Sequence, residues 1–231
     1  RVITREIGQS NSTALSLKIT QVSANDMYIV TALSIISFII TLFVMGYQYN
    51  VVRFAIDKKE GLPGFTDITN TFVNGIKFFI VAIAYYIIPA AVLFIGILLS
   101  GDSSALPIVV LISLILFIVA YFLQIMAGNN MVANDSLKKA FDLREITEKI
   151  ANLGWGKYIG IVLFTVIVMM IISVAVGIIL SFITVAFAAV INNQAVIISI
   201  VIAIIEGLFI DSYMTVFFSR VCGSIYRESI K

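Results

Sequence analysis

Five long apolar runs, separated by shorter polar segments, form the main pattern of the chain. They cover about residues 27–49, 78–99, 106–126, 158–190 and 196–219. Each run has about 20 residues or more, the length that an α-helix needs to cross roughly 30 Å of hydrocarbon. A helix also bonds its backbone internally, which a lipid environment demands. The pattern therefore predicts an all-α fold, a polytopic transmembrane helix bundle with five visible spans.

Two of the polar segments carry apolar side chains at helical spacing. In the segment before the second run, residues four apart are apolar: Ile68, Phe72 and Ile76. In the segment before the fourth run, one helical face is apolar: Leu143, Ile146, Ile150 and Leu153. We expect two short amphipathic helices that lie at the cytoplasmic membrane interface. Their likeness indicates a duplicated three-helix unit, which predicts six spans in the full chain.

Composition agrees with a membrane protein, since 61% of the 231 residues are hydrophobic and 12% are charged. We expect a polar extracytoplasmic segment over residues 1–26 and a single transmembrane domain over residues 27–231. Twelve of the 15 basic residues fall in three segments that five spans place on one side. Because basic residues collect on the cytoplasmic side, we predict a multi-pass protein of the cell membrane with a cytoplasmic C-terminus.

The scarcity of histidine and cysteine limits the chemistry that the chain can perform. The chain has no histidine and one cysteine, which leaves no His-ligated metal site, no His-based catalysis and no internal disulfide. A net charge of +2 gives no footprint for nucleic acid. We therefore expect no enzymatic activity, no metal, no cofactor and no nucleic-acid partner.

Glu206 is the most unusual residue because it lies within an apolar run. A carboxylate inside a membrane is expensive, so it faces other helices, binds a proton or cation, or pairs. Asp211 lies further along, and Tyr213 shares the face of Glu206 at i+7 in an α-helix. One interpretation is an ion or proton site formed by these three residues. The other is a hydrogen-bonded contact between helices.

Three further polar residues lie inside the apolar runs, namely Tyr85, Tyr86 and Gln124. They are candidates for lining a cavity, while helix packing around a kink at Pro89 explains the tyrosines equally. The fourth run is longer than one crossing. A bend near residues 177–184 would account for its length, as would tilt or projection beyond the bilayer.

Several motifs in a consistent order resemble a known family. They are Gly46-Tyr47, Leu62-Pro63-Gly64-Phe65, Phe72-Val73-Asn74-Gly75-Ile76-Lys77, Tyr85-Tyr86 with Pro89, Ala140-Phe141-Asp142 with Glu145-Ile146, and Trp155 with Tyr158. Over roughly residues 40–160 the chain resembles the prokaryotic membrane proteins called domain of unknown function 4013. One departure is Arg53, which follows Gly46-Tyr47 at a longer distance than is usual in that family. The resemblance implies a multi-helix membrane protein, archaeal in origin, and implies no activity or catalytic residue.

Two functions remain open at this point. The first is a non-enzymatic membrane scaffold that contacts membrane lipids, or a protein partner on the cytoplasmic face, through Lys58, Lys59, Lys138 and Lys139. The alternative is a small proton- or cation-coupled transporter that uses Glu206. The sequence does not predict the oligomeric state.

Overall fold

All regular secondary structure in the described part of the protein is helical. The computed structural model describes residues 24–100, 105–190, 201–202 and 206–231. Four helices in these ranges are long and apolar enough to cross a membrane, namely Met27–Ile56, Ile68–Leu99, Leu106–Asn134 and Trp155–Phe187. The predicted fifth span, 196–219, lies partly outside the described residues, so it stays a prediction. The chain divides into two units, residues 1–42 and 43–231, and each is described by itself.

The first unit contains the beginning of α2 (Ala24–Ile56). Its side chains from Met27 to Ile40 are exposed and mostly apolar. The hydroxyls of Thr31 and Ser34 donate to the carbonyls four residues earlier, each at 2.8 Å. Such internal bonds allow Ser and Thr to occupy a lipid-facing helix.

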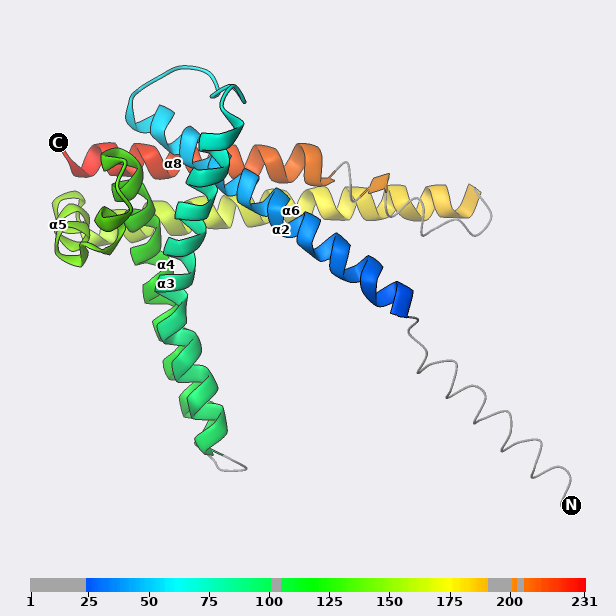
Figure 1. The fold of residues 1–231 in the computed structure, drawn as a ribbon, viewed down its shortest axis with the longest axis horizontal. Helices are drawn as coiled ribbons and strands as arrows, with labels where there is room; N and C mark the ends of the chain where they lie inside the picture. Colours follow the sequence, from blue (N-terminus) through cyan, green and yellow to red (C-terminus); the bar gives the residue numbers. More distant parts are fainter. Residues whose placement is uncertain (1–23, 101–104, 191–200, 203–205) are drawn as a thin grey trace, which may run out of the picture. The chain divides into compact units, whose positions relative to one another are not determined.

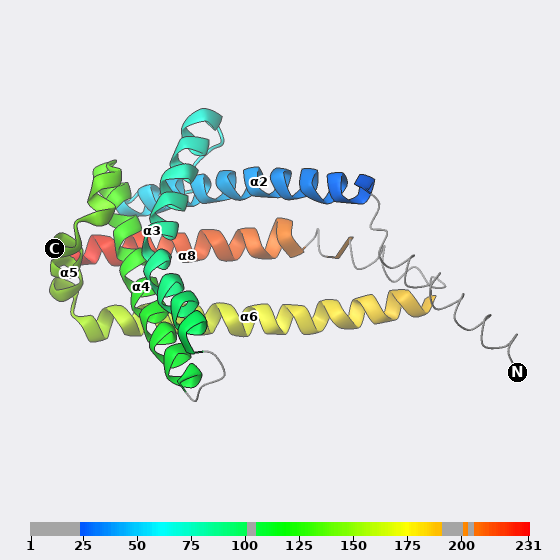
Figure 2. The same cartoon turned by 60° about the horizontal axis from the view of Figure 1, so that its bottom comes forward.

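The second unit holds the remaining helices (Figure 1). After the end of α2 they follow in the order α3 (Ile68–Ser100), α4 (Leu106–Asn134), the 3₁₀ helix η1 (Leu137–Phe141), α5 (Leu143–Leu153), α6 (Trp155–Val190), the π-helix η2 (Glu206–Asp211) and α8 (Ser212–Ser229). Helices α3 and α4 run side by side in Figures 1 and 2, and α8 contacts α4, α5 and α6.

The buried core lies at one end of the long helices. We call this region the packed end: the last turns of α2, α4 and α8, the first turns of α3 and α6, and all of η1 and α5. Its largest fully buried side chains include Tyr49, Met126, Met131, Ile146 and Tyr158. Figure 1 shows α5, the start of α6 and the end of α8 gathered beside the C-terminal part of α4. Away from the packed end most side chains are apolar and exposed, as a lipid-facing surface requires.

Two glycines let α2 approach its neighbours closely. A Cβ on Gly46 would lie 1.7 Å from the backbone oxygen of Thr71 in α3. A Cβ on Gly223 of α8 would lie 2.6 Å from Cβ of Ala55 and 2.7 Å from the oxygen of Val52. Small residues allow such backbone contacts between membrane helices. These two residues therefore set the spacing of α2 from α3 and from α8.

The structure bears on two of the sequence-based interpretations. The first predicted amphipathic segment is no separate helix, because α3 is continuous from Ile68 to Ser100. Gly75, near the junction of the predicted amphipathic segment and the second span, costs only about 1 kcal/mol and does not interrupt the helix. The length of the fourth run does not come from an interruption, since α6 is one continuous helix from Trp155 to Val190, which leaves tilt or projection beyond the bilayer as the alternatives. The hydroxyl of Thr184 bonds within the helix to Leu180 at 2.8 Å.

The second predicted amphipathic segment forms a helix of its own, α5. The Asp142 side chain accepts a hydrogen bond from the Glu145 backbone at 3.2 Å, which caps its first turn. Ile146 and Ile150 are fully buried. Its position at a membrane interface remains a prediction.

Candidate functional site

Two asparagines form a buried polar network at the packed end. Asn130 donates to the carbonyl of Lys139 at 2.9 Å and accepts from the hydroxyl of Tyr226 at 2.9 Å. Asn129 donates to the carbonyl of Cys222 at 2.9 Å. Both amides are at most 2% exposed. Because buried polar groups are costly when unpaired, these bonds tie α4 to η1 and to α8.

A second polar cluster surrounds Glu145. Its carboxylate lies 2.5 Å from Nζ of Lys139 and 3.1 Å from Nζ of Lys149. Lys149 also lies over the Tyr226 ring, 4.8 Å from the centroid. The hydrogen bond from Lys139 is the main cause that lowers the pKa of Glu145 from its ordinary 4.5 to about 2. Lys139, predicted to contact lipid or a partner, thus forms an ion pair with Glu145 while its side chain stays partly exposed.

This shifted pKa predicts a pH-dependent stability. A carboxyl whose pKa is lower in the folded state contributes stability above its unfolded pKa and loses it as the pH falls. We expect wild-type protein to lose about 1–3 kcal/mol between pH 4.5 and pH 2 through this group, and Glu145→Gln to lack that step. Thermal unfolding midpoints from pH 2 to pH 7 measure it. The control is Glu148→Gln, whose surface pair with Arg144 contributes little; an equal step in Glu145→Gln would contradict the prediction.

A third cluster joins the ends of three helices around Asp135. The Tyr49 hydroxyl donates to its carboxylate at 2.7 Å, and Nζ of Lys77 lies 3.3 Å away. Arg53 is more distant, at 3.7 Å. The Tyr49 bond, followed by that of Lys77, lowers the pKa of Asp135. This carboxylate thus links the end of α4 to α2 and α3.

A basic pocket of about 380 Å³ lies between the end of α2 and α8. Its charged lining consists of Lys58, Lys59, Glu60, Arg220, Arg227 and Lys231. The structure thus brings Lys58 and Lys59, both predicted interface residues, to one site. Lys138 does not line this pocket and is exposed on η1. The arrangement offers several cations to an anionic group at the surface.

The candidate cavity residues are not brought together. Tyr85 lines a pocket of about 310 Å³ between α3, α4 and η1, and its hydroxyl donates to the carbonyl of Ala140 at 2.7 Å. Tyr86 packs against Phe117 with ring centroids 6.0 Å apart, and Gln124 is half-buried on α4. Neither of these two lines that pocket. With its polar atom already bonded, Tyr85 offers the pocket mainly an aromatic surface.

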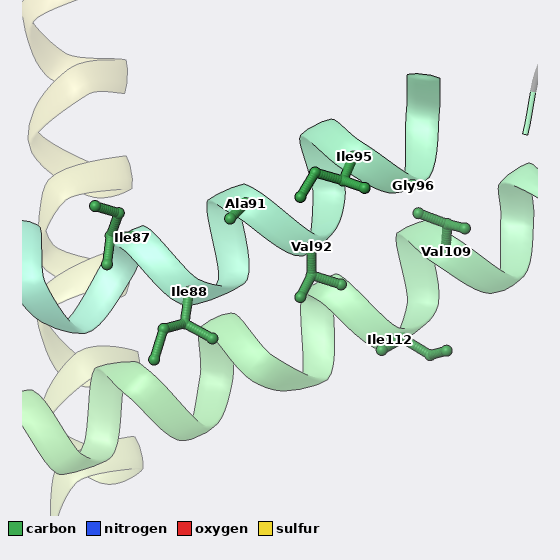
Figure 3. A pocket seen from close by; sticks show the side chains of 8 residues that line it. All are labelled: Ile87, Ile88, Ala91, Val92, Ile95, Gly96, Val109 and Ile112. Atoms are coloured by element: carbon green, nitrogen blue, oxygen red, sulfur yellow. The ribbon is translucent and has the colours of Figure 1, made fainter. Parts of the chain in front are cut away.

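A larger pocket of about 490 Å³ lies between α3 and α4 (Figure 3). Every residue that lines it is apolar: Ile87, Ile88, Ala91, Val92, Ile95 and Gly96 on α3, and Val109 and Ile112 on α4. Gly96 allows the close approach, since a Cβ there would lie 2.2 Å from a methyl of Val109. The pocket offers contacts to an apolar chain and no group for a polar substrate.

The candidate ion site lies at the edge of the described residues. Glu206 is half-buried and Asp211 is exposed, and both belong to the π-helix η2. A π-helix has wider turns than an α-helix, so the α-helical i+7 spacing does not place Tyr213 over Glu206. Tyr213 is 67% exposed. None of the pockets described above includes these residues, and transport through Glu206 stays a prediction.

Sequence reasoning missed the two features that organise the packed end. The asparagines at the end of α4 were not among its candidate residues, although their amides bridge helices. It used Arg220, Arg227 and Lys231 only for topology. Arg220, Ser224 and Arg227 lie at i, i+4 and i+7 on one face of α8, and Lys231 follows just beyond the end of this helix. This spacing is a signal that was present in the sequence.

Four helices able to cross a membrane, joined by a polar packed end, define a multi-pass membrane protein. A sequence model of the family described as "Protein of unknown function (DUF4013)" matches residues 29–181. The chain belongs to this family, as its motifs indicated. No curated protein and no solved structure matches the chain.

Proposed function

We propose that the protein is a non-enzymatic membrane protein whose packed end contacts anionic lipid headgroups on the cytoplasmic side. The observation that carries the proposal is the basic pocket between α2 and α8. Five of its charged residues are basic and one, Glu60, is acidic. Basic clusters next to membrane spans attract anionic lipids by about 1 kcal/mol for each lysine or arginine.

The polar groups of the packed end support a structural role. Asn129, Asn130 and Glu145 are occupied by bonds within the protein. Burial raises the pKa of Cys222 to about 12, which makes its thiol a poor nucleophile at neutral pH. In the described residues no group of three or more His, Cys, Asp or Glu side chains could hold a metal ion. These observations favour a scaffold that holds its helices together and presents basic side chains.

The proposal predicts that anionic lipid stabilises the purified protein. We expect the thermal unfolding midpoint to be about 3–8 °C higher with phosphatidylglycerol than with phosphatidylcholine, since binding to the folded state stabilises it. The difference should shrink at high salt because exposed charges are screened. The triple variant Lys58→Gln, Lys59→Gln, Lys138→Gln should lose most of it.

The matched control also removes three positive charges, but from the predicted outer segment. It is the triple variant Arg1→Gln, Arg5→Gln, Lys18→Gln, which should keep the wild-type difference between the two lipids. Equal midpoints in both lipids would contradict the proposal, and so would equal losses in the two triple variants.

A further inference from the structure

The basic pocket has walls from two helices whose distance is set by a backbone contact. One wall is the last turn of α2 with the residues that follow it, and the other is α8. Gly223 on α8 packs against Ala55 and Val52 of α2 with no room for a side chain. The positions of Arg220 and Arg227, three residues before and four after this glycine, therefore follow from rigid packing.

Both arginines are held in place by backbone carbonyls. Nη1 of Arg220 donates to the carbonyl of Lys59 at 3.0 Å, and Nη1 of Arg227 donates to that of Ala55 at 3.1 Å. A guanidinium has five N–H donors, so each arginine keeps donors for a ligand. Arginines restrained in this way lose little freedom when they bind an oxyanion in bidentate fashion.

The charges of the pocket are only partly balanced by the protein. Lys59 pairs with Asp57 at 3.2 Å and Lys231 pairs with Glu228 at 3.6 Å. Lys58, Arg220 and Arg227 form no ion pair in the ranges that the structure describes. With Glu60 as the one acidic residue in the lining, the pocket keeps an excess of about two positive charges. A phosphomonoester carries about −1.5 to −2 at neutral pH, whereas a phosphodiester carries −1.

Lys58 occupies a backbone position that favours glycine. Its φ is 57°, in the left-handed region. The backbone N–H groups of Lys58 and Lys59 donate to Ala55 at 3.4 Å and Phe54 at 2.9 Å, which is the pattern of a Schellman motif. Glycine is the usual residue there because other side chains strain the backbone. A lysine at this position lowers stability while it adds a cation to the pocket.

We propose that the pocket between α2 and α8 binds a phosphomonoester group through Arg220, Arg227 and Lys58. This assignment rests on the proposed function and names the ligand chemistry of the same face. The candidate span Met27–Ile56 ends beside the pocket, and Arg220 follows the predicted span 196–219 directly. A pocket at the ends of two spans would lie at the level of the lipid headgroups, so a headgroup with a terminal phosphate can reach it. Free phosphate carries the same chemistry.

Binding measurements on the full chain in neutral detergent micelles test the assignment. The probes are short-chain phosphatidic acid (a phosphomonoester), short-chain phosphatidylglycerol (a phosphodiester) and inorganic phosphate. We expect phosphatidic acid to bind at least about fivefold more tightly than phosphatidylglycerol, since it adds a charge-assisted contact. Competition by millimolar inorganic phosphate would identify the phosphate group alone as sufficient. A lack of competition, with phosphatidic acid bound, would assign the site to the lipid headgroup.

Two variants change the pocket in opposite directions. Lys58→Gly should weaken phosphatidic acid about fivefold and raise the thermal unfolding midpoint of the lipid-free protein, because glycine relieves the left-handed position. Glu60→Gln should tighten binding by a similar factor, since it removes the acidic residue of the lining. Arg144→Gln is the control, with the same charge loss on the exposed face of α5.

The outcomes separate the site from the general function. Unchanged affinity in Lys58→Gly and Glu60→Gln would overturn the assignment. Equal binding of the two lipids, weakened as much by Arg144→Gln as by Lys58→Gly, would also overturn it, while a diffuse anionic-lipid contact would stand. Binding of neither anionic lipid would overturn both the site and the proposed function.

Discussion

Replacing Gly46 by alanine is expected to destabilise the protein by about 3 kcal/mol, at the upper end of overpacking effects. The new Cβ would lie 1.7 Å from the oxygen and 2.7 Å from the carbon of the Thr71 carbonyl, and 3.1 Å from the backbone nitrogen of Gly75. All three are backbone atoms of α3, so no side-chain rotation relieves the overlap. Helices α2 and α3 would have to separate, which we expect to lower the thermal unfolding midpoint in micelles.

The control for this prediction is Gly160→Ala in α6. No neighbouring atom lies within 4 Å of a Cβ built there. Alanine in a helix interior is up to about 1 kcal/mol more favourable than glycine, so this variant should be neutral or more stable. If both variants melted at the wild-type temperature, the close contact between α2 and α3 would be disproved.

The second large effect is expected at Asn130. Alanine at this position leaves the Lys139 carbonyl and the Tyr226 hydroxyl without the partner that each has in the structure. Each unsatisfied buried group costs about 1–3 kcal/mol, so we expect a total loss of about 3 kcal/mol. Titration of the micellar protein with a denaturing detergent, with unfolding followed by fluorescence, would measure this change in the free energy of unfolding.

Asn134→Ala is the matched control because it removes the same kind of side-chain amide one turn later in α4. Asn134 donates to the side chain and to the carbonyl of Asn130, at 3.1 and 2.9 Å, both within α4. Its loss should cost less than about 1 kcal/mol. Combining Asn130→Ala with Tyr226→Phe should cost less than the sum of the single changes, because the two share one bond. Strict additivity would show that this bond contributes nothing.

The sequence predicts the long helices well because their apolar runs exceed the length of a span. The long helices α2, α3, α4 and α6 contain the first four predicted spans. Their ends extend further, since helix propagation continues into polar residues that pack against other parts of the protein. The long apolar runs report contact with lipid, so they could not show that α2 continues to Ile56 or that the helical segment from Ile68 is continuous with the second span.

The polar contacts of the packed end were beyond the reach of sequence reasoning. Asn129 and Asn130 satisfy the rule that asparagine favours helix ends, yet their amides reach residues 93 and 96 positions away. Lys139 looked like a free basic residue, while in the structure it pairs with Asp142 and Glu145. The spacing of Arg220 and Arg227 on α8 could be seen in the sequence as a periodic pattern. That Lys58 lies across the pocket from them could not, because this depends on the packing of Gly223 against α2.

The position of the packed end has a consequence for synthesis of the protein. If the packed end is cytoplasmic, as the basic residues predict, its polar residues stay on the ribosome's side of the membrane while the helices insert one after another. The core needs Cys222, Gly223 and Tyr226 of α8, so it cannot close before α8 has left the exit tunnel. Until then, α3 and α4 can pack against each other, but Asn129 and Asn130 lack their hydrogen-bond partners on α8.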